Sequence, residues 1–303
     1  MSITTSELHM QVGGISHTGG RTNNEDAILL ETISPSPDLP AGGWLLAVAD
    51  GMGGHDNGEM ASNLAIQTLR EQVLQSSQPD AALALKQAYR KANEAIYDAG
   101  GEATDKHPGT TLVSAVVRGK YVTIANVGDS RAYLMRANQL TQITQDHSVI
   151  AEQLASGELR PGALPDKELR GKLTAALGTM PDLERRLPAI YEIVLLPEDR
   201  LLLCSDGFYD VMQNTDYLSL MGTDDAQSSA LALTDLAVQR KTTDNVSAVV
   251  LAVGSSLATM QRAEIARDLA EHRAEHGTSI LVPVIILIIL TALVAAGVWY
   301  WMF

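Results

Sequence analysis

Four times along this chain, an apolar segment or its edge meets an aspartate that is followed by a small or polar residue. The first case is the clearest: residues 45–49 are suited to a buried strand and run into Asp50, and four glycines follow within the next eight residues. A buried carboxylate is costly unless it is paired or binds a metal ion. The chain must therefore fold so that a partner reaches Asp50 at the end of this strand.

The other three aspartates, Asp129, Asp206 and Asp244, stand at similar junctions. Each one alone is more typical of a turn or a helix cap, because aspartate side chains hydrogen-bond to nearby backbone. Gathered at one mouth of a fold, however, four carboxylates could not all stay ionised without cations. Oxygen ligands without histidine or cysteine favour Mg²⁺ or Mn²⁺ over zinc. We therefore predict a site for such ions, with Asp50 as a bridging ligand and the Gly51 carbonyl as a further oxygen donor.

The segment RTNNEDA adds a cation and two carboxylates within six residues: Arg21, Glu25 and Asp26. Arginine is suited to a phosphate dianion, because its planar guanidinium can donate two parallel hydrogen bonds. This segment, together with the four aspartates, favours a metal site that also binds phosphate over four unrelated turns.

Apolar, β-rich runs and helical patterns follow one another along most of the chain. Strands are expected at 44–49, 111–117, 121–127, 131–135, 190–196, 200–204 and 246–253. Helices are expected at 58–75, 81–99, 149–156, 228–240 and 257–275. Strands clustered between pairs of helices indicate an α+β layered sandwich rather than alternating βαβ units. The short connection within VVRGKYV favours antiparallel pairing.

Eight segments, in order along residues 12–253, resemble the motif series of the metal-dependent protein phosphatases, the PPM family, in its bacterial form. They are RTNNEDA, LLAVADGMGGHDNGE, GTTLVSAVV, ANVGDSRAYL, DHSVIAEQLASGEL, LTAALG, LLLCSDGFYD and TTDNVSAVVL. Eight motifs in the same order make the resemblance specific, and it leaves out residues 254–303.

The resemblance implies a four-layer α-β-β-α sandwich with a central antiparallel β-sandwich. It also implies a binuclear Mn²⁺ or Mg²⁺ centre that hydrolyses phosphoserine and phosphothreonine in proteins by a metal-bridged water. By position, Asp50 corresponds to the ligand that bridges both ions, and Asp206 and Asp244 correspond to ligands of one of them. Arg21 corresponds to the phosphate-binding arginine.

The ligands of the second ion follow from the same resemblance. The Gly51 carbonyl and Asp26 correspond to that ligand set, with Glu25 nearby through water. Asp129 corresponds to a residue that helps to hold a weaker third metal ion. The resemblance therefore implies two ions and a third site.

The chain departs from part of the family at the proposed general acid. Some members carry a histidine directly after Asp-Gly, whereas this chain has Met52 there and a histidine only at His55. A lone histidine in a glycine-rich loop is more often a surface residue than an acid, so a metal-bound water is the better candidate. The polar segment 156–172 corresponds to the family's mobile flap and equally to an ordinary surface loop, and the sequence does not decide between them.

Charge and cysteine content exclude two other classes. The formal net charge of −14 argues against a nucleic-acid partner, because neutralising phosphates needs a basic face. The single cysteine, Cys204, can form no internal disulfide and fits a reducing compartment. A thiolate phosphatase would need arginine six residues after it, where this chain has Asp210. Cys204 is therefore predicted to be a core residue.

The segment 280–303 carries no charge, and 24 helical residues at about 1.5 Å each exceed the hydrocarbon thickness of about 30 Å. We interpret it as a single transmembrane helix. The N-terminus does not resemble a signal peptide, so the preceding part is expected on the cytoplasmic face of the inner (plasma) membrane. The predicted organisation is a phosphatase domain at 1–254, a stalk helix at 255–279 and the membrane span at 280–303.

The sequence thus predicts a membrane-tethered Ser/Thr protein phosphatase that acts on phosphoproteins, opposes a Ser/Thr kinase and contacts lipid through its C-terminal helix. Two alternatives stay open. The same fold could serve one partner-switching regulator, or it could be an inactive PPM-like scaffold that recruits partners to the membrane. The retained aspartates speak against the scaffold, because a scaffold needs no charged cluster.

Overall fold

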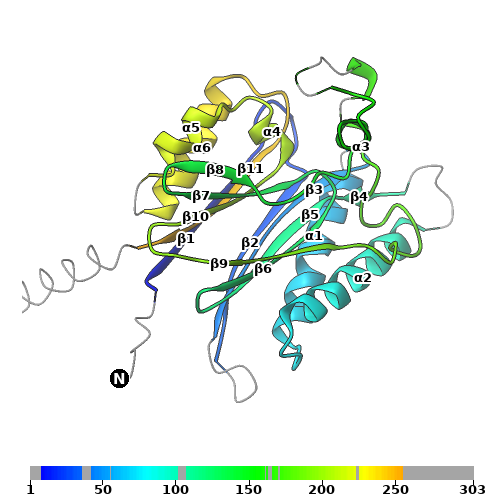
Figure 1. Ribbon diagram of the computed structural model, residues 1–303. Helices are drawn as coiled ribbons and strands as arrows, with labels where there is room; N and C mark the ends of the chain where they lie inside the picture. Colours follow the sequence, from blue (N-terminus) through cyan, green and yellow to red (C-terminus); the bar gives the residue numbers. More distant parts are fainter. Residues whose placement is uncertain are drawn as a thin grey trace, which may run out of the picture. The chain divides into compact units, whose positions relative to one another are not determined.

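The computed structural model describes residues 8–35, 42–54, 56–101, 107–160, 162, 166–169, 171–222 and 225–254. All of them belong to one compact unit, Met1–Ser255. Its centre consists of two β-sheets in which every pair of neighbouring strands is antiparallel (Figure 1). The antiparallel sandwich predicted from the sequence is therefore confirmed.

The two sheets draw their strands from both halves of the chain. The five-stranded sheet has the order β1 (Met10–His17), β11 (Val246–Val253), β10 (Arg200–Cys204), β7 (Arg131–Arg136) and β8 (Gln139–Gln142). The second sheet has the order β2 (Asp26–Ile33), β3 (Gly43–Met52), β5 (Leu112–Arg118), β6 (Tyr121–Val127) and β9 (Ala189–Val194), with β4 (Gly109–Thr110) pairing with the end of β3.

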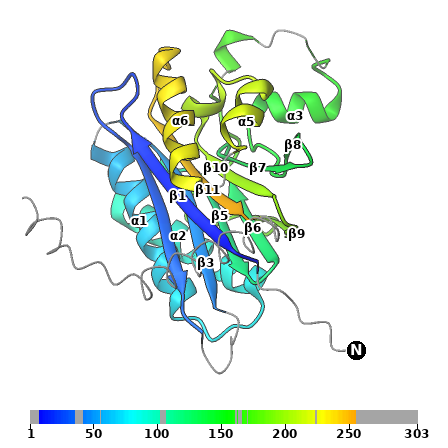
Figure 2. The ribbon, with the colours of Figure 1, turned by 90° about the vertical axis from the view of Figure 1, so that its left-hand side faces the viewer.

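Helices cover the outer face of each sheet (Figures 1 and 2). The second sheet is covered by α1 (Asp56–Leu74) and α2 (Ala81–Gly100). The five-stranded sheet is covered by α4 (Asp206–Tyr209), α5 (Asn214–Leu220) and α6 (Ala226–Gln239). The remaining helices, α3 (Val149–Ser156) and the one-turn η1 (Lys167–Leu169), belong to the segment after the β8 hairpin. The result is the α-β-β-α order of layers that was expected.

The strands are apolar on both faces because each sheet lies between two apolar layers. In β3, Leu45 and Ala47 pack in the cluster formed with α1 and α2, whereas Leu46 and Val48 pack between the sheets. This alternation follows from the period of two residues along a strand. It explains why 45–49 is a continuous apolar run and why Asp50 ends it at the edge of the core.

Most predicted elements match closely, and strands at 121–127, 200–204 and 246–253 match to the residue. The prediction missed β1, β2 and β8 and the short elements β4, α4, α5 and η1. In β1 the strand pattern is weakened by glycines, which lower β-propensity. Packing explains Gly13, because a Cβ there would lie 2.3 Å from the backbone nitrogen of Gln227 in α6.

Among the described residues, no helix is both long enough and apolar enough to cross a membrane. The predicted stalk at 255–279 and span at 280–303 lie outside the described residues. Both stay predictions.

Candidate metal centre

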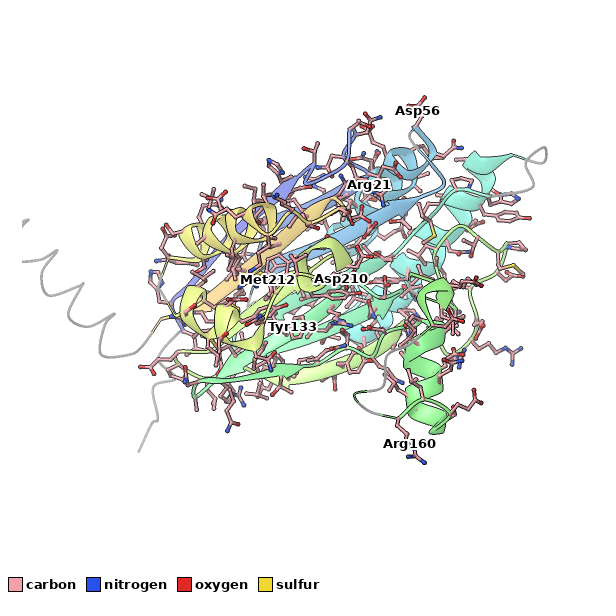
Figure 3. The ribbon with its side chains drawn as sticks, turned by 90° about the horizontal axis from the view of Figure 1, so that it is seen from above. Arg21, Asp56, Tyr133, Arg160, Asp210 and Met212 are labelled. Carbon is pink, nitrogen blue, oxygen red and sulfur yellow. The ribbon has the colours of Figure 1, made fainter. Side chains whose placement is uncertain are left out.

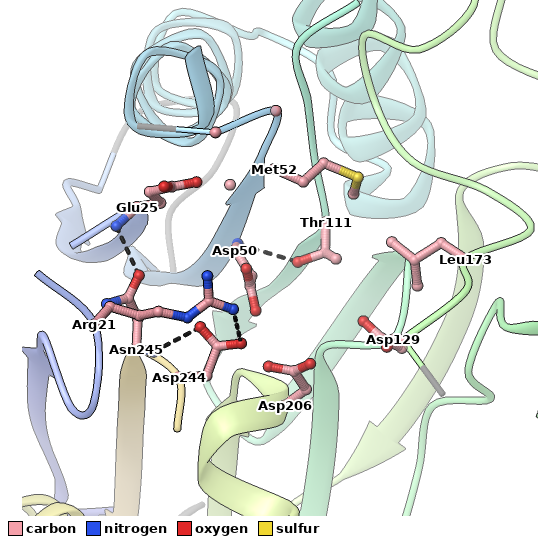
Figure 4. Close-up of a pocket in the computed structure, with 14 residues that line it drawn as sticks. Arg21, Glu25, Asp50, Met52, Thr111, Asp129, Leu173, Asp206, Asp244 and Asn245 are labelled. Atoms are coloured by element: carbon pink, nitrogen blue, oxygen red, sulfur yellow. Dashed lines mark hydrogen bonds and ion pairs between the residues drawn. The ribbon is translucent and has the colours of Figure 1, made fainter. Parts of the chain in front are cut away.

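A pocket of about 320 Å³ opens at one end of the sandwich (Figure 4). The sequence-predicted residues that line it come from five separate segments: Arg21, Glu25, Asp50, Gly51, Asp129, Asp206 and Asp244. The structure therefore brings together all but two of the predicted site residues in one cavity. The two others are Asp26, which does not line the pocket, and His55, which is outside the described residues.

Asp50 is held through its backbone at the end of β3. Its amide donates to Thr111 Oγ1 at 3.1 Å, and its carbonyl accepts from the Thr111 amide at 2.9 Å. The Thr110 hydroxyl donates to the same carbonyl at 2.9 Å. These bonds fix the main chain on both sides of the carboxylate, so its position does not depend on the glycine-rich loop that follows.

Asp206 lies in the first turn of α4, after the N-cap residue Ser205. Gly207 lets this turn approach the residue just before β11, since a Cβ there would lie 2.1 Å from the Asn245 carbonyl oxygen. In this Asp-Gly pair the aspartate supplies a carboxylate to the pocket, and the glycine is required by close packing. Asp206 Oδ1 is buried and has no hydrogen-bond partner.

The start of β11 is joined to the loop between β1 and β2 by Asn245, which is 5% exposed. Its Oδ1 accepts from the Glu25 amide at 2.9 Å. Its Nδ2 donates to the carbonyls of Thr18 and Asn23, at 2.9 and 2.8 Å. One amide side chain therefore positions the loop that carries Arg21 and Glu25 beside Asp244.

Two glycines admit the Glu25 side chain to the pocket. A Cβ at Gly58, in the first turn of α1, would lie 2.1 Å from Glu25 Oε2. A Cβ at Gly51 would lie 2.1 Å from the Gly58 carbonyl oxygen. The glycines that follow Asp50 therefore serve close packing around an acidic side chain, and Glu25 lines the pocket as a result.

Asp26 stands directly opposite Asp50 in the β2–β3 ladder and is buried. Ser205 Oγ donates to its Oδ2 at 2.8 Å, while its Oδ1 is buried without a hydrogen-bond partner. Burial raises the pKa of Asp26 to about 7, against the hydrogen bonds from Ser247 and Ser205 that lower it. This carboxyl interacts electrostatically with the pocket residues Asp50, Asp206 and Asp244, and one of its oxygens has no hydrogen bond.

Three carboxyls of the pocket, those of Asp50, Asp129 and Asp206, have raised pKa values. Burial is the largest cause of each increase in pKa, and neighbouring carboxylates add to it. The pKa of Asp50 is raised well above its usual value, that of Asp129 is raised to about 7 and that of Asp206 to about 6. Such groups resist ionisation unless positive charge is brought to them.

Arg21 supplies one positive charge. Its Nη2 donates to Asp244 Oδ2 at 2.6 Å, and its Nε donates to the Thr243 carbonyl at 3.2 Å. The hydrogen bond to Asp244 raises the pKa of the guanidinium. Its side chain is 55% exposed, so part of the fork is open to a ligand that enters the pocket.

The donor set fits a hard divalent cation. All ionisable donors are carboxylates, and buried oxygens of Asp26 and Asp206 have no partner. In the part of the chain that the structure describes, no three histidine, cysteine, aspartate or glutamate side chains form a ready ligand group for a metal. The fit therefore rests on the chemistry of the donors, because hard ions such as Mg²⁺ and Mn²⁺ prefer carboxylate and carbonyl oxygens.

The pocket also has lining residues that the sequence analysis did not assign to the site: Met52, Gly53, Gly54, Thr111, Gly171, Leu173 and Asn245. Thr111 and Asn245 lie inside motifs that were recognised, but their work is hydrogen bonding to backbone, which residue type alone does not show. Gly171 lies near the end of the segment 156–172, which was considered as a flap, and Leu173 is the residue just after it. That segment therefore reaches the pocket at its C-terminal end.

A layered α-β-β-α fold with carboxylates and an arginine at one mouth defines a metal-dependent hydrolase type of site. The sequence profile of the Protein phosphatase 2C family matches residues 10–153. The serine/threonine phosphatase stp of Listeria welshimeri is 34% identical over 177 residues, which cover 57% of this chain and 69% of that protein. The chain belongs to the protein phosphatase 2C family, also called the PPM family.

Two further comparisons bear on the catalytic part. The serine/threonine protein phosphatase PstP of Mycobacterium tuberculosis is 34% identical over 233 residues, which cover 76% of this chain and 42% of PstP. The chain thus matches less than half the length of that relative. A crystal structure of the PstP catalytic domain in complex with two manganese ions superposes with a TM-score of 0.69 and 32% identity, covering 82% of this chain and all of that domain.

Proposed function

We propose that this chain hydrolyses phosphoserine and phosphothreonine in proteins at the pocket described above, with Mn²⁺ or Mg²⁺ as cofactor. The observation that carries the proposal is the cluster of buried carboxyls with raised pKa values around Arg21. Relatives that carry the name serine/threonine phosphatase, and the manganese ions of the PstP catalytic domain, support it.

The residues that would hold the ions follow from their positions. Asp50, at the centre of the pocket lining in Figure 4, would be the ligand shared by both ions, and Asp206 and Asp244 would hold one of them. The Gly51 carbonyl would serve the second ion, with Glu25 beside it, and the unpartnered Oδ1 is the atom of Asp26 left for a ligand role. Two bound ions would lower the pKa of a shared water toward about 7 and neutralise phosphoryl oxygens.

The chain's own groups would bind and orient the phosphate. The exposed part of the Arg21 guanidinium can donate two parallel hydrogen bonds to phosphoryl oxygens, while its bond to Asp244 sets its direction. Asp129 faces the same space and is the candidate for the third ion. Cys204 is fully buried and burial raises the pKa of its thiol, so it is not a nucleophile.

The test is phosphate release from a phosphothreonine peptide by the full chain, with Mn²⁺, with Mg²⁺ and with excess chelator. Release that needs metal and disappears in Asp50→Asn is the expected result. Asp98→Asn on the exposed face of α2 is the matched control and should retain activity. No release under any metal would reject the enzyme and favour the scaffold alternative.

We also propose that segment 280–303 tethers the domain to the inner (plasma) membrane, with the catalytic part in the cytoplasm, where a Ser/Thr kinase would supply its phosphoprotein substrates. The support is the uncharged run of 24 residues and the arginines Arg262, Arg267 and Arg273 before it. Membrane fractionation tests this: the full chain should sediment with membranes, and a chain ending at Gly254 should not.

A further inference from the structure

Beside the pocket, Arg131 forms a two-pronged ion pair with Asp146. Its Nε lies 3.0 Å from Asp146 Oδ1, and its Nη2 lies 2.7 Å from Asp146 Oδ2. Both side chains are mostly buried, with 23% and 11% exposed. A third bond, from Arg131 Nη1 to the Tyr133 hydroxyl at 2.9 Å, completes the restraint. The plane of the guanidinium is therefore fixed, although Arg131 does not itself line the pocket.

The fixed guanidinium lies over the ring of Tyr209. Its Cζ is 3.5 Å from the ring centroid, which is the geometry of a close cation–π contact. Arginine suits this place because its flat group can stack on a ring and bind a carboxylate with its edge at the same time. Lysine could supply the charge but not both contacts.

Tyr209 connects two of the pocket carboxylates. Its hydroxyl donates to the backbone carbonyl of Asp129 at 3.2 Å. It is also the last residue of α4, the four-residue helix that begins at Asp206. A shift of the ring would therefore move Asp206 through the helix and Asp129 through the hydrogen bond.

We propose that Arg131 is a positioning residue that, held by Asp146, clamps Tyr209 and thereby fixes Asp129 and Asp206 relative to each other. The proposal rests on the proposed function, because the positions of the two carboxylates affect turnover only if they bind the metal ions that the reaction needs. The effect of Arg131 is limited to Asp129 and Asp206, since Asp50 and Asp244 are held by other contacts.

Strand β7 offers a matched control at its other end. Arg136 forms a similar two-pronged pair with Asp199, at 2.9 and 2.6 Å, and does not line the pocket. Arg131→Lys and Arg136→Lys both keep the charge and lose the fork. A difference between them therefore reports position and not general loss of an ion pair.

The experiment measures Mn²⁺ binding by electron paramagnetic resonance of the free ion, together with turnover of a phosphothreonine peptide, using the full chain. Arg131→Lys and Tyr209→Leu should weaken Mn²⁺ binding and lower kcat by about tenfold each, as expected for residues that orient ligands. Tyr209→Phe, which keeps the ring and loses the hydroxyl, should fall between them and the wild type. KM should change by less than about twofold, because Arg21 is untouched.

Three outcomes decide the matter. Wild-type behaviour of Arg131→Lys in both readouts would overturn the positioning role and leave the proposed function intact. An equal loss in Arg136→Lys would do the same, because the effect would then be general. A wild-type chain that neither binds Mn²⁺ nor releases phosphate would reject the proposed function and the clamp with it.

Discussion

Arg21 and Asp244, which are 223 residues apart in the sequence, meet across the pocket at 2.6 Å. Figure 3 shows Arg21 from above, on the loop that joins β1 to β2. The contact joins the candidate phosphate-binding residue to a candidate metal ligand. The position of the guanidinium therefore depends on the segment just before β11, which carries Asp244, as well as on its own loop.

Replacing Arg21 tests this arrangement. In Arg21→Lys we expect KM for a phosphothreonine peptide to rise and kcat to fall, each by about tenfold, because lysine cannot offer a planar fork to phosphate. The free energy of unfolding should change by less than about 1 kcal/mol, since the ion pair is largely exposed. Steady-state kinetics and urea denaturation give the two values. Unchanged KM would contradict a phosphate-binding role.

Replacing Asn245, unlike replacing Arg21, should lower the free energy of unfolding substantially. Asn245→Ala removes three hydrogen bonds that hold the 18–25 loop and leaves buried backbone groups without partners. We expect a loss of about 2–3 kcal/mol in the free energy of unfolding, with turnover reduced as well. Urea denaturation measures the first effect. The control is Asn63→Ala on α1, where one exposed hydrogen bond is lost and little change is expected.

The layers and the acidic cluster could be predicted because they depend on pattern. Continuous apolar runs such as 45–49 and 246–253 require burial on both faces, and an aspartate at the end of such a run must meet a partner. Roles that depend on the third dimension could not be predicted. Nothing in the residue type of Asn245 says that it binds three backbone groups from a loop more than 200 residues away.

Local propensity also failed to predict a strand where close packing requires glycine, a residue of low β-propensity. The sequence did not reveal β1, which has Gly13 and Gly14 at its middle. At Gly13 the helix α6 leaves no room for a side chain, and at Gly14 an added Cβ would lie 2.9 Å from Leu30 Cδ1 in β2. Asp26 shows a second limit. The resemblance implies a ligand role for Asp26 but does not show that its Oδ2 accepts a hydrogen bond from Ser205, which leaves Oδ1 as the oxygen without a partner.

Gly58 allows a prediction in which two effects compete. Alanine is favoured over glycine within a helix by about 1 kcal/mol, so Gly58→Ala would normally stabilise α1. Here the added Cβ would lie 2.1 Å from Glu25 Oε2 and must displace that carboxylate. We expect weaker Mn²⁺ binding, measured by calorimetry, with little gain in stability. Gly222→Ala, where the nearest heavy atom is 3.5 Å from the added Cβ, should leave binding unchanged.

The raised pKa values predict how stability depends on pH and on metal. In the folded chain the pKa is about 7 for Asp26 and Asp129 and about 6 for Asp206, against about 3.9 for aspartate in an unfolded chain. Between about pH 4 and pH 7 the folded state therefore binds more protons than the unfolded state. The free energy of unfolding contributed by these groups is fully present below this window and is lost as the pH rises through it.

In excess chelator, the melting temperature should consequently fall between about pH 5 and pH 7.5. Saturating Mn²⁺ should reduce that fall, because the ions supply the charge that the ionised carboxyls need and bind only the folded site. Asp129→Asn removes one of the titrating groups, so its decline in chelator should be shallower than that of the wild type. Thermal unfolding followed by circular dichroism measures all three series. A melting temperature that rises with pH in chelator would show that these carboxyls are not buried as the structure places them.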